Sequence, residues 1–221
     1  MATDMATTHD CSNPDELLTG MRLARLAIGR GELVVLPTDT VYGVAADAFN
    51  AAAVQRLLDA KGRTRQSPPP VLIPGIPTLD ALASAVPDEV RALVAAYWPG
   101  GLTVILPARE SLQWDLGETA GTVALRMPDN RVALELLSET GPLAVSSANL
   151  TGQPPATTAE AAQKMLGESV SVYLDGGVGG AKGSTIVDAT GLLRDGGELR
   201  IVRSGVIPDD AIMEVIRGDA G

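Results

Sequence analysis

Hydroxyl and amide side chains follow the predicted strands at positions suited to binding an anion. Thr38 and Thr40 come directly after the apolar run VVLP, and Ser147 and Asn149 follow LAVS. In open α/β sheets the loops at strand ends converge on the ligand crevice. Hydroxyls and amides donate hydrogen bonds to oxygen atoms, and arginine holds carboxylate or phosphate through two parallel hydrogen bonds. Further polar residues stand at the ends of predicted elements: Asp39, Tyr42, Lys61, Arg63, Arg65, Arg126, Ser184 and Arg203.

A cluster of cations stands out in an acidic chain. Lys61, Arg63 and Arg65 lie within AKGRTRQSPPPV, although the formal net charge is -10. The overall charge argues against non-specific nucleic-acid binding, which needs a broad basic surface, but it leaves room for a narrow basic cleft. Structural roles stay open as well. Cations after a helix are favoured by the helix dipole, and Thr38 and Ser147 are suited to capping turns.

Several catalytic classes are disfavoured by the composition. The chain has one cysteine, Cys11, and one histidine, His9, which argues against a disulfide framework, a cysteine-rich metal site and a Ser-His-Asp triad. The stretch GGVGGAKGST is similar to a phosphate loop, but Gly183 separates Lys182 from Ser184. That motif requires Gly-Lys followed directly by Ser or Thr. We interpret the stretch as glycine-rich turns.

Helices and strands alternate in the prediction, without a composition break or a long linker. We therefore predict one α/β domain over residues 14–217, a twisted mixed β-sheet flanked by helices. A capping box of Thr157 and Glu160 opens one of the helices. The predicted helices span residues 13–31, 50–62, 87–98, 130–140, 157–166 and 208–217. The predicted strands span residues 32–37, 71–73, 102–107, 121–128, 142–146, 171–175, 184–190 and 198–205.

The polar start of the chain, MATDMATTHDCSN, carries no apolar pattern. We predict that residues 1–13 form a disordered tail in which His9 and Cys11 have no role. No apolar run reaches the length of a transmembrane helix, and the N-terminus lacks the layout of a signal peptide. The sequence therefore predicts a cytoplasmic protein with no membrane partner.

Six motifs occur in the same order as in a known family: LPTDTVYGVAADAF, AKGR, WPGGLTVIL, TVALRMP, VSSANLTGQP and STIVD. Over residues 15–215 the chain resembles the YrdC/TsaC-type L-threonylcarbamoyladenylate synthases, in their short, single-domain form. The paired motifs of active members, Lys-x-Arg and Ser-x-Asn, are present as Lys61/Arg63 and Ser147/Asn149. The resemblance implies a YrdC-like fold with a concave, positively charged cleft.

The resemblance also implies a reaction. L-threonine takes up carbon dioxide from bicarbonate as a carbamate, the carbamate oxygen attacks the α-phosphorus of ATP, and pyrophosphate leaves. The product, threonylcarbamoyl-AMP, serves the threonylcarbamoyladenosine modification of tRNA, which separate transfer proteins complete. Such an enzyme is a nucleotidyltransferase. Mg²⁺ is expected on the ATP phosphates, without a dedicated protein metal site.

Roles for individual residues follow from the same resemblance. Attack at phosphorus builds up charge on phosphate oxygens, so catalysis would depend on positioning and electrostatics. The resemblance gives catalytic roles to Lys61, Arg63, Ser147 and Asn149. It gives L-threonine contacts to Thr38, Thr40, Arg126, Val145 and Ser184. It gives ATP contacts to Lys61, Arg63, Ser67, Thr122, Ser147 and Arg203.

Departures from the family pattern stand at Thr64 and Gly101, where proline is usual, and at Gly183, where glutamate is common. They bear on how the loop after Arg65 closes over substrate and on which amino acids are accepted. Two alternatives stay open. One is a family relative with another nucleotide-dependent carbamoyl role: relatives that share the fold without a settled role are favoured over hydrogenase-maturation proteins, because those contain zinc fingers and this chain has no cysteine pair. The other is weak RNA binding by the cleft, which would require a wide basic face.

Overall fold

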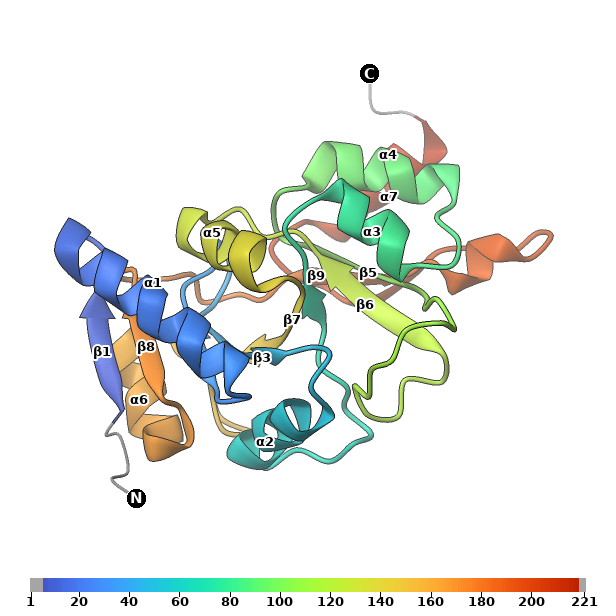
Figure 1. Cartoon of the computed structure of the whole chain (residues 1–221). Coiled ribbons are helices and arrows are strands. Elements are labelled where there is room, and N and C mark those ends of the chain that lie inside the picture. The colour runs from blue at the N-terminus through green and yellow to red at the C-terminus, as the bar shows by residue number, and fades with distance from the viewer. Residues whose placement is uncertain (1–5, 219–221) are drawn as a thin grey trace.

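A computed structural model of the chain describes residues 6–218 (Figure 1). Their strands form one ten-stranded sheet in the order β1-β8-β2-β3-β7-β4-β6-β5-β9-β10. The strands are β1 (Thr7–Asp10), β2 (Val34–Leu36), β3 (Gly43–Asp47), β4 (Val71–Leu72), β5 (Leu102–Pro107), β6 (Thr122–Arg126), β7 (Leu143–Ser147), β8 (Val172–Asp175), β9 (Thr185–Asp188) and β10 (Arg200–Arg203). Strand β4 pairs parallel with β6 and antiparallel with β7. The predicted mixed sheet in a single α/β domain is confirmed.

Seven α-helices flank this sheet within the described part of the chain. They are α1 (Pro14–Gly29), α2 (Ala51–Lys61), α3 (Ile76–Leu82), α4 (Asp88–Tyr97), α5 (Arg131–Thr140), α6 (Ala159–Leu166) and α7 (Asp209–Arg217), with short 3-10 helices η1 (Gly167–Ser169) and η2 (Thr190–Leu193). None of these helices is long and apolar enough to cross a bilayer. Helix α3 and strand β3 were not predicted from the sequence.

Asparagine side chains begin three of the helices by accepting hydrogen bonds from orphan backbone amides. Asn13 caps α1, Asn50 caps α2 and Asn130 caps α5. The predicted capping box at Thr157 is wrong by one residue, because Thr158 caps α6. The carbonyl of Thr157 instead accepts a hydrogen bond from Gly179, which ties the glycine-rich loop to the start of α6.

The predicted disordered tail is wrong for residues that the structure describes. Thr7–Asp10 form β1, an edge strand parallel to β8, and the backbone amide of Cys11 donates to Asp175. His9 packs tightly on Gly20 of α1, where a β-carbon on the glycine would lie 2.7 Å from its side chain. The segment is held by backbone pairing and is largely exposed, so its sequence needs no apolar alternation. Residues 1–5 lie outside the described residues.

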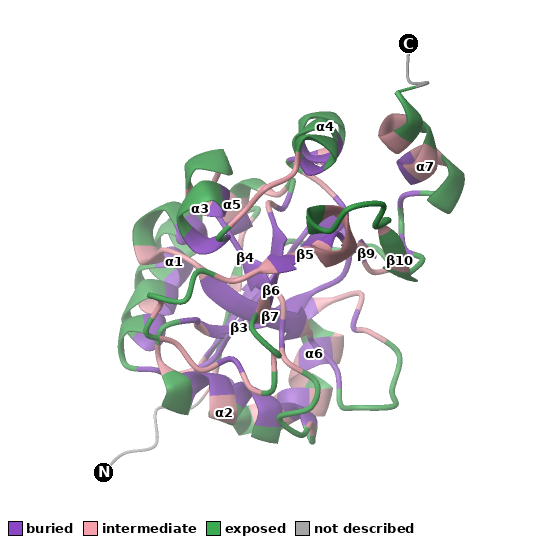
Figure 2. Cartoon of the chain, turned by 90° about the vertical axis from the view of Figure 1, so that its right-hand side faces the viewer, coloured by how far each residue is buried: buried purple, intermediate pink, exposed green. Residues whose placement is uncertain are grey.

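The helices cover both faces of one half of the sheet and a single face of the other half. Around β2, β3 and β8, helices α1 and α5 pack on one face, and α2 and α6 pack on the opposite face. Around β5, β6 and β9, helices α3, α4 and α7 pack on one face only. Figure 2 shows the buried strands at the centre and the exposed outer surfaces of the helices.

Alternation along β5, β6 and β9 separates the two faces of this second half. Successive side chains of a strand point to opposite sides of the sheet, so every second residue faces the helices. The buried side packs Leu102, Val104, Leu106, Val123, Leu125 and Val187 against the helices. The opposite side presents Thr103, Ile105, Thr122, Ala124, Arg126 and Ile186 to a cavity. The face without helices is therefore the floor of that cavity.

This alternation predicts unequal effects of two truncations on adjacent strands. Leu125→Ala should lower the free energy of unfolding by about 2–5 kcal/mol, because it leaves a void beneath the helices. Ile105→Ala removes a similar volume from the cavity floor and should lower it by about 1 kcal/mol. Urea denaturation of both variants measures the difference. Equal losses would contradict the assignment of the two faces.

Candidate active site

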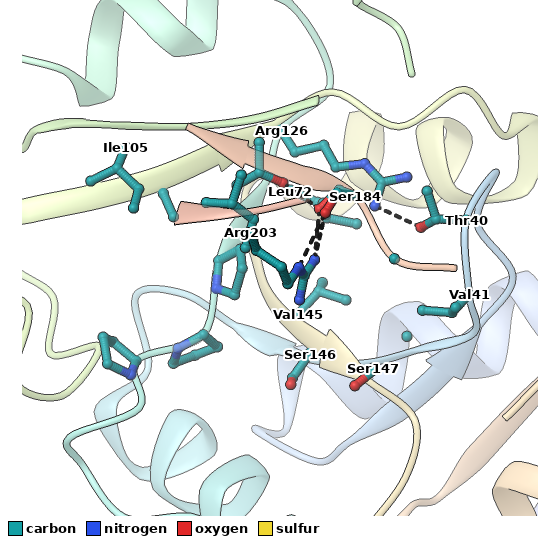
Figure 3. A pocket seen from close by; sticks show the side chains of 18 of the residues that line it. Thr40, Val41, Leu72, Ile105, Arg126, Val145, Ser146, Ser147, Ser184 and Arg203 are labelled. Atoms are coloured by element: carbon teal, nitrogen blue, oxygen red, sulfur yellow. Dashed lines mark hydrogen bonds between the residues drawn. The ribbon is translucent and has the colours of Figure 1, made fainter. Parts of the chain in front are cut away.

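A cavity of about 490 Å³ lies on the open face of the sheet, within the size range of small-molecule sites. Of the described residues that line it, three are arginines and none is an aspartate or glutamate. It brings together nine of the residues predicted from the sequence: Thr38, Thr40, Arg63, Thr122, Arg126, Val145, Ser147, Ser184 and Arg203. Figure 3 labels Thr40, Arg126, Val145, Ser147, Ser184 and Arg203 among them. Lys61, Ser67 and Asn149 are not among the lining residues.

Arg126 is held from three sides at one end of the cavity. Its Nη2 forms an ion pair with Asp39 at 2.6 Å, its Nη1 donates to Thr40 Oγ1 at 2.8 Å, and its Nε donates to Gly100 O. Burial lowers the pKa of this guanidinium, and Asp39 counteracts the shift. A buried charge of this kind requires a partner, and Asp39 supplies it.

The TDT turn that carries Asp39 is fixed by its own hydroxyl groups. Thr38 Oγ1 donates to Val41 O at 2.7 Å and accepts from the Thr40 backbone amide. The glycine-rich loop packs directly on this turn, because a β-carbon at Gly180 would lie 2.1 Å from Thr40 O. A glycine at position 180 is therefore required for the close packing of this loop on the turn.

Arg203 reaches over the cavity from β10 to the start of β9. Its Nη2 donates to the backbone oxygen of Ser184 at 2.8 Å and lies 3.1 Å from the hydroxyl, as the dashed lines in Figure 3 show. The hydroxyl of Ser184 in turn lies 2.7 Å from Thr103 Oγ1. These contacts fix both the arginine and the serine on the cavity wall.

Arg63 stands opposite, on the loop that follows α2. Its Nη1 donates to Ser146 Oγ at 3.2 Å. Burial, followed by the charges of Arg126 and Arg63, lowers the pKa of Arg203, so Arg126 and Arg63 each repel the guanidinium of Arg203. A bound anion would relieve this repulsion. That the cleft as a whole is positively charged stays a prediction, because Asp39 neutralises Arg126.

Lys61, at the end of α2, is buried and is not among the described residues that line the cavity. Its Nζ donates to the backbone oxygens of Ser147 and Asn149, the latter at 2.7 Å. Asn149 is buried as well, and its Nδ2 donates to Leu150 O and Gln153 O, both at 2.8 Å. Among residues 6–218, its Oδ1 is a buried oxygen without a hydrogen-bond partner. Ser67, which was predicted to contact ATP, is exposed in the loop just before the prolines at 68–70.

The sequence did not predict the side chains that contact the site residues. It left Asp39 without a role and did not single out Ser146 or Thr103, although these side chains contact Arg126, Arg63 and Ser184 respectively. The positions of Ser146 and Thr103 in the sequence partly indicate their role. Both are hydroxyls within or at the end of predicted strands, where alternation decides which side they face.

Comparison with known proteins assigns the chain to a family. The family described as Telomere recombination, with the members Sua5, YciO and YrdC, matches residues 26–205. The chain belongs to the Sua5/YciO/YrdC family. It is 48% identical over 217 residues to a putative threonylcarbamoyl-AMP synthase of Mycobacterium tuberculosis, covering 98% of each protein. It is 39% identical to the threonylcarbamoyl-AMP synthase of Bacillus subtilis, covering 83% of this chain and 56% of that protein.

Solved structures of this family share the fold. Sua5 of P. abyssi, solved in complex with L-threonine, aligns with a TM-score of 0.85 and 32% identity, over 96% of this chain and 61% of that chain. YciO of E. coli aligns with a TM-score of 0.78 and 23% identity, over 94% of this chain and 98% of that chain. This likeness supports the fold alone. The resemblance inferred from the six motifs is confirmed.

The buried ammonium of Lys61 predicts a distinct dependence of stability on pH. Burial lowers its pKa from the ordinary 10.5 to about 7, and Arg63 acts in the same direction. Between these two values the unfolded chain binds more protons than the folded chain, so stability rises with pH. The contribution of Lys61 to the free energy of unfolding is therefore complete above the pKa that this lysine has in the unfolded chain. It is lost as the pH falls through the pKa that the lysine has in the folded protein.

The test compares wild type with Lys61→Met by urea denaturation from pH 7 to about 10. The difference in unfolding free energy, wild type minus variant, should increase steadily over this window. Subtracting the variant removes the contribution of other groups that titrate in this range. A flat difference would mean that Lys61 keeps an ordinary pKa in the folded protein.

Proposed function

We propose that the chain is an L-threonylcarbamoyladenylate synthase, a nucleotidyltransferase that makes threonylcarbamoyl-AMP and pyrophosphate from L-threonine, bicarbonate and ATP. The observation that carries the proposal is the convergence of Arg63, Arg126 and Arg203 on one cavity whose described lining has no carboxylate. Two of the substrates and the carbamate intermediate are anions. Support also comes from the nearly full-length similarity to proteins named putative threonylcarbamoyl-AMP synthase.

The amino-acid end of the cavity would be the corner around Arg126. A guanidinium has five N–H donors, and the three contacts of Arg126 leave one N–H on each of its terminal nitrogens. These two donors suit the carboxylate of an amino acid, held in bidentate fashion. Thr38, Thr40, Val145 and Ser184 would complete the threonine subsite. Sua5 of P. abyssi, with which this chain shares the fold, has been solved with L-threonine.

The nucleotide end would lie between Arg63 and Arg203. Both guanidiniums would donate to phosphate oxygens and stabilise the charge that develops as the carbamate oxygen attacks the α-phosphorus. Ser147, at the end of β7, would donate from its hydroxyl, and Thr122 would contact the nucleotide. No covalent intermediate on the protein is needed, since the reaction depends on holding two anions in line against their mutual repulsion.

Mg²⁺ would enter with ATP rather than occupy a protein site. Among residues 6–218 no cluster of three or more His, Cys, Asp or Glu side chains is placed to hold a metal ion. The described lining of the cavity offers hydroxyl groups and no carboxylate. Such a lining fits an ion that keeps phosphate oxygens and water as ligands. When bound, the ion would neutralise phosphate charge alongside the arginines.

The product would be consumed by separate proteins that transfer the threonylcarbamoyl group to tRNA. We propose that this takes place in the cytoplasm, as the sequence predicts. Direct RNA binding stays a prediction, and a salt-dependent gel shift would test it.

Substrate omission tests the proposed function. Pyrophosphate release should require L-threonine, bicarbonate and ATP together, because attack on the α-phosphorus needs the carbamate that the first two form. The measurement is pyrophosphate release with each substrate left out in turn, combined with mass detection of threonylcarbamoyl-AMP. Equal release without threonine would identify an ATPase and refute the proposal.

Two matched substitutions test the arrangement of the subsites. Arg126→Lys should raise the KM for threonine by at least about tenfold and change the KM for ATP little, because a point charge replaces a bidentate fork. Arg203→Lys should show the opposite preference. Steady-state kinetics with each substrate varied provides both values. Parallel changes in the two constants for either variant would show that the subsites are misassigned.

A further inference from the structure

Lys61 holds the segment of residues 147–153, termed here the 147–153 turn, from three points. Its Nζ donates to the backbone oxygens of Ser147 and Asn149, and its own backbone oxygen accepts from the amide of Thr151 at 2.9 Å. With 1% of its surface exposed, the side chain is enclosed by protein. The end of α2 and the end of β7 are thereby joined through a single residue.

Asn149 holds the same turn from within. Its Nδ2 bridges the carbonyls of Leu150 and Gln153, and its backbone amide donates to Ser147 O at 2.9 Å. Lys61 and Asn149 therefore direct their donors at backbone oxygens of one turn. Neither belongs to the described lining of the cavity, whereas Arg63 and Ser147 do.

We infer that the paired motifs divide into two functions: Arg63 and Ser147 contact the substrates, and Lys61 and Asn149 are positioning residues that fix the 147–153 turn and thereby the hydroxyl of Ser147. This inference rests on the proposed function of the cavity. It departs from the role that the sequence assigned to Lys61, a contact to the triphosphate. The reason is geometric: the ammonium already donates to two backbone oxygens of the turn, and Lys61 is not among the described residues that line the cavity.

The division explains the spacing of both motifs. Lys61 closes α2, and Gly62 follows in the left-handed conformation with φ 64°, so the chain reverses before Arg63. The two cations have different partners beyond the helix end: Lys61 Nζ donates to Ser147 O and Asn149 O, and Arg63 Nη1 donates to Ser146 Oγ. In the second motif, Ser147 is the last residue of β7, and Asn149 lies within the turn. One residue of each pair faces the cavity, and the other secures the backbone behind it.

Hydrogen exchange on the substrate-free protein tests the structural half of the inference. Lys61→Met should speed amide exchange within residues 147–153 by at least about tenfold, because it removes two of the bonds that hold the turn. Arg63→Lys is the matched control and should change exchange there by less than about twofold. If Lys61→Met proves insoluble, Lys61→Gln, whose shorter amide reaches the carbonyls poorly, takes its place in the same comparison.

A double-mutant cycle tests the functional half. Ser147→Ala should lower kcat at least about tenfold in wild type and in Arg63→Lys, but at most about threefold in Lys61→Met, where the hydroxyl is already misplaced. A residue that only supports the fold would leave the effect of Ser147→Ala unchanged in the molecules that remain folded.

The inference is overturned if Lys61→Met leaves the turn as protected as in wild type, or if its effect on kcat multiplies with that of Ser147→Ala. Failure of the proposed function gives a different result. In that case wild type makes no threonylcarbamoyl-AMP, while the exchange comparison still decides whether Lys61 holds the turn.

Discussion

The covering of only one face of β6, β5 and β9 is the constraint on which the rest of the structure depends. Helices α3, α4 and α7 bury one side of these strands, and strand alternation then sends every second side chain into open space. The opposite half of the sheet is covered on both faces and cannot supply such a floor. An acidic chain can therefore present a small group of cations on a protected surface without becoming basic overall.

The three arginines around the cavity differ in how far their charges are compensated. Arg126 is buried and paired with Asp39, which partly compensates its charge and holds its position. In the described contacts Arg63 and Arg203 meet hydroxyl and carbonyl oxygens rather than carboxylates. The guanidinium of Arg126 suits a carboxylate that must be held in one orientation. Arg63 and Arg203, which have no carboxylate partner in the described contacts, suit phosphates whose charge grows during the reaction. The proposed division between the amino-acid and nucleotide ends rests on which arginine has an acidic partner.

The sequence predicted which residues gather at the site better than it predicted their directions. Thr38, Arg126 and Ser184 follow strand ends, and sheet topology alone brings such positions together. Lys61 and Asn149 were expected to face substrate, but spacing along a chain does not reveal that an ammonium has two backbone oxygens within reach. Strand β1 escaped prediction because a polar edge strand is specified by backbone pairing with β8 rather than by an apolar pattern.

The central claim is that one open face of the sheet holds the amino acid and the nucleotide side by side. A crystal structure of the protein with L-threonine and a non-hydrolysable ATP analogue tests it most directly. The account predicts the threonine carboxylate on the terminal nitrogens of Arg126, with the phosphates between Arg63 and Arg203. Either ligand bound outside the cavity, or phosphates bound to Arg126 with the carboxylate elsewhere, would contradict it.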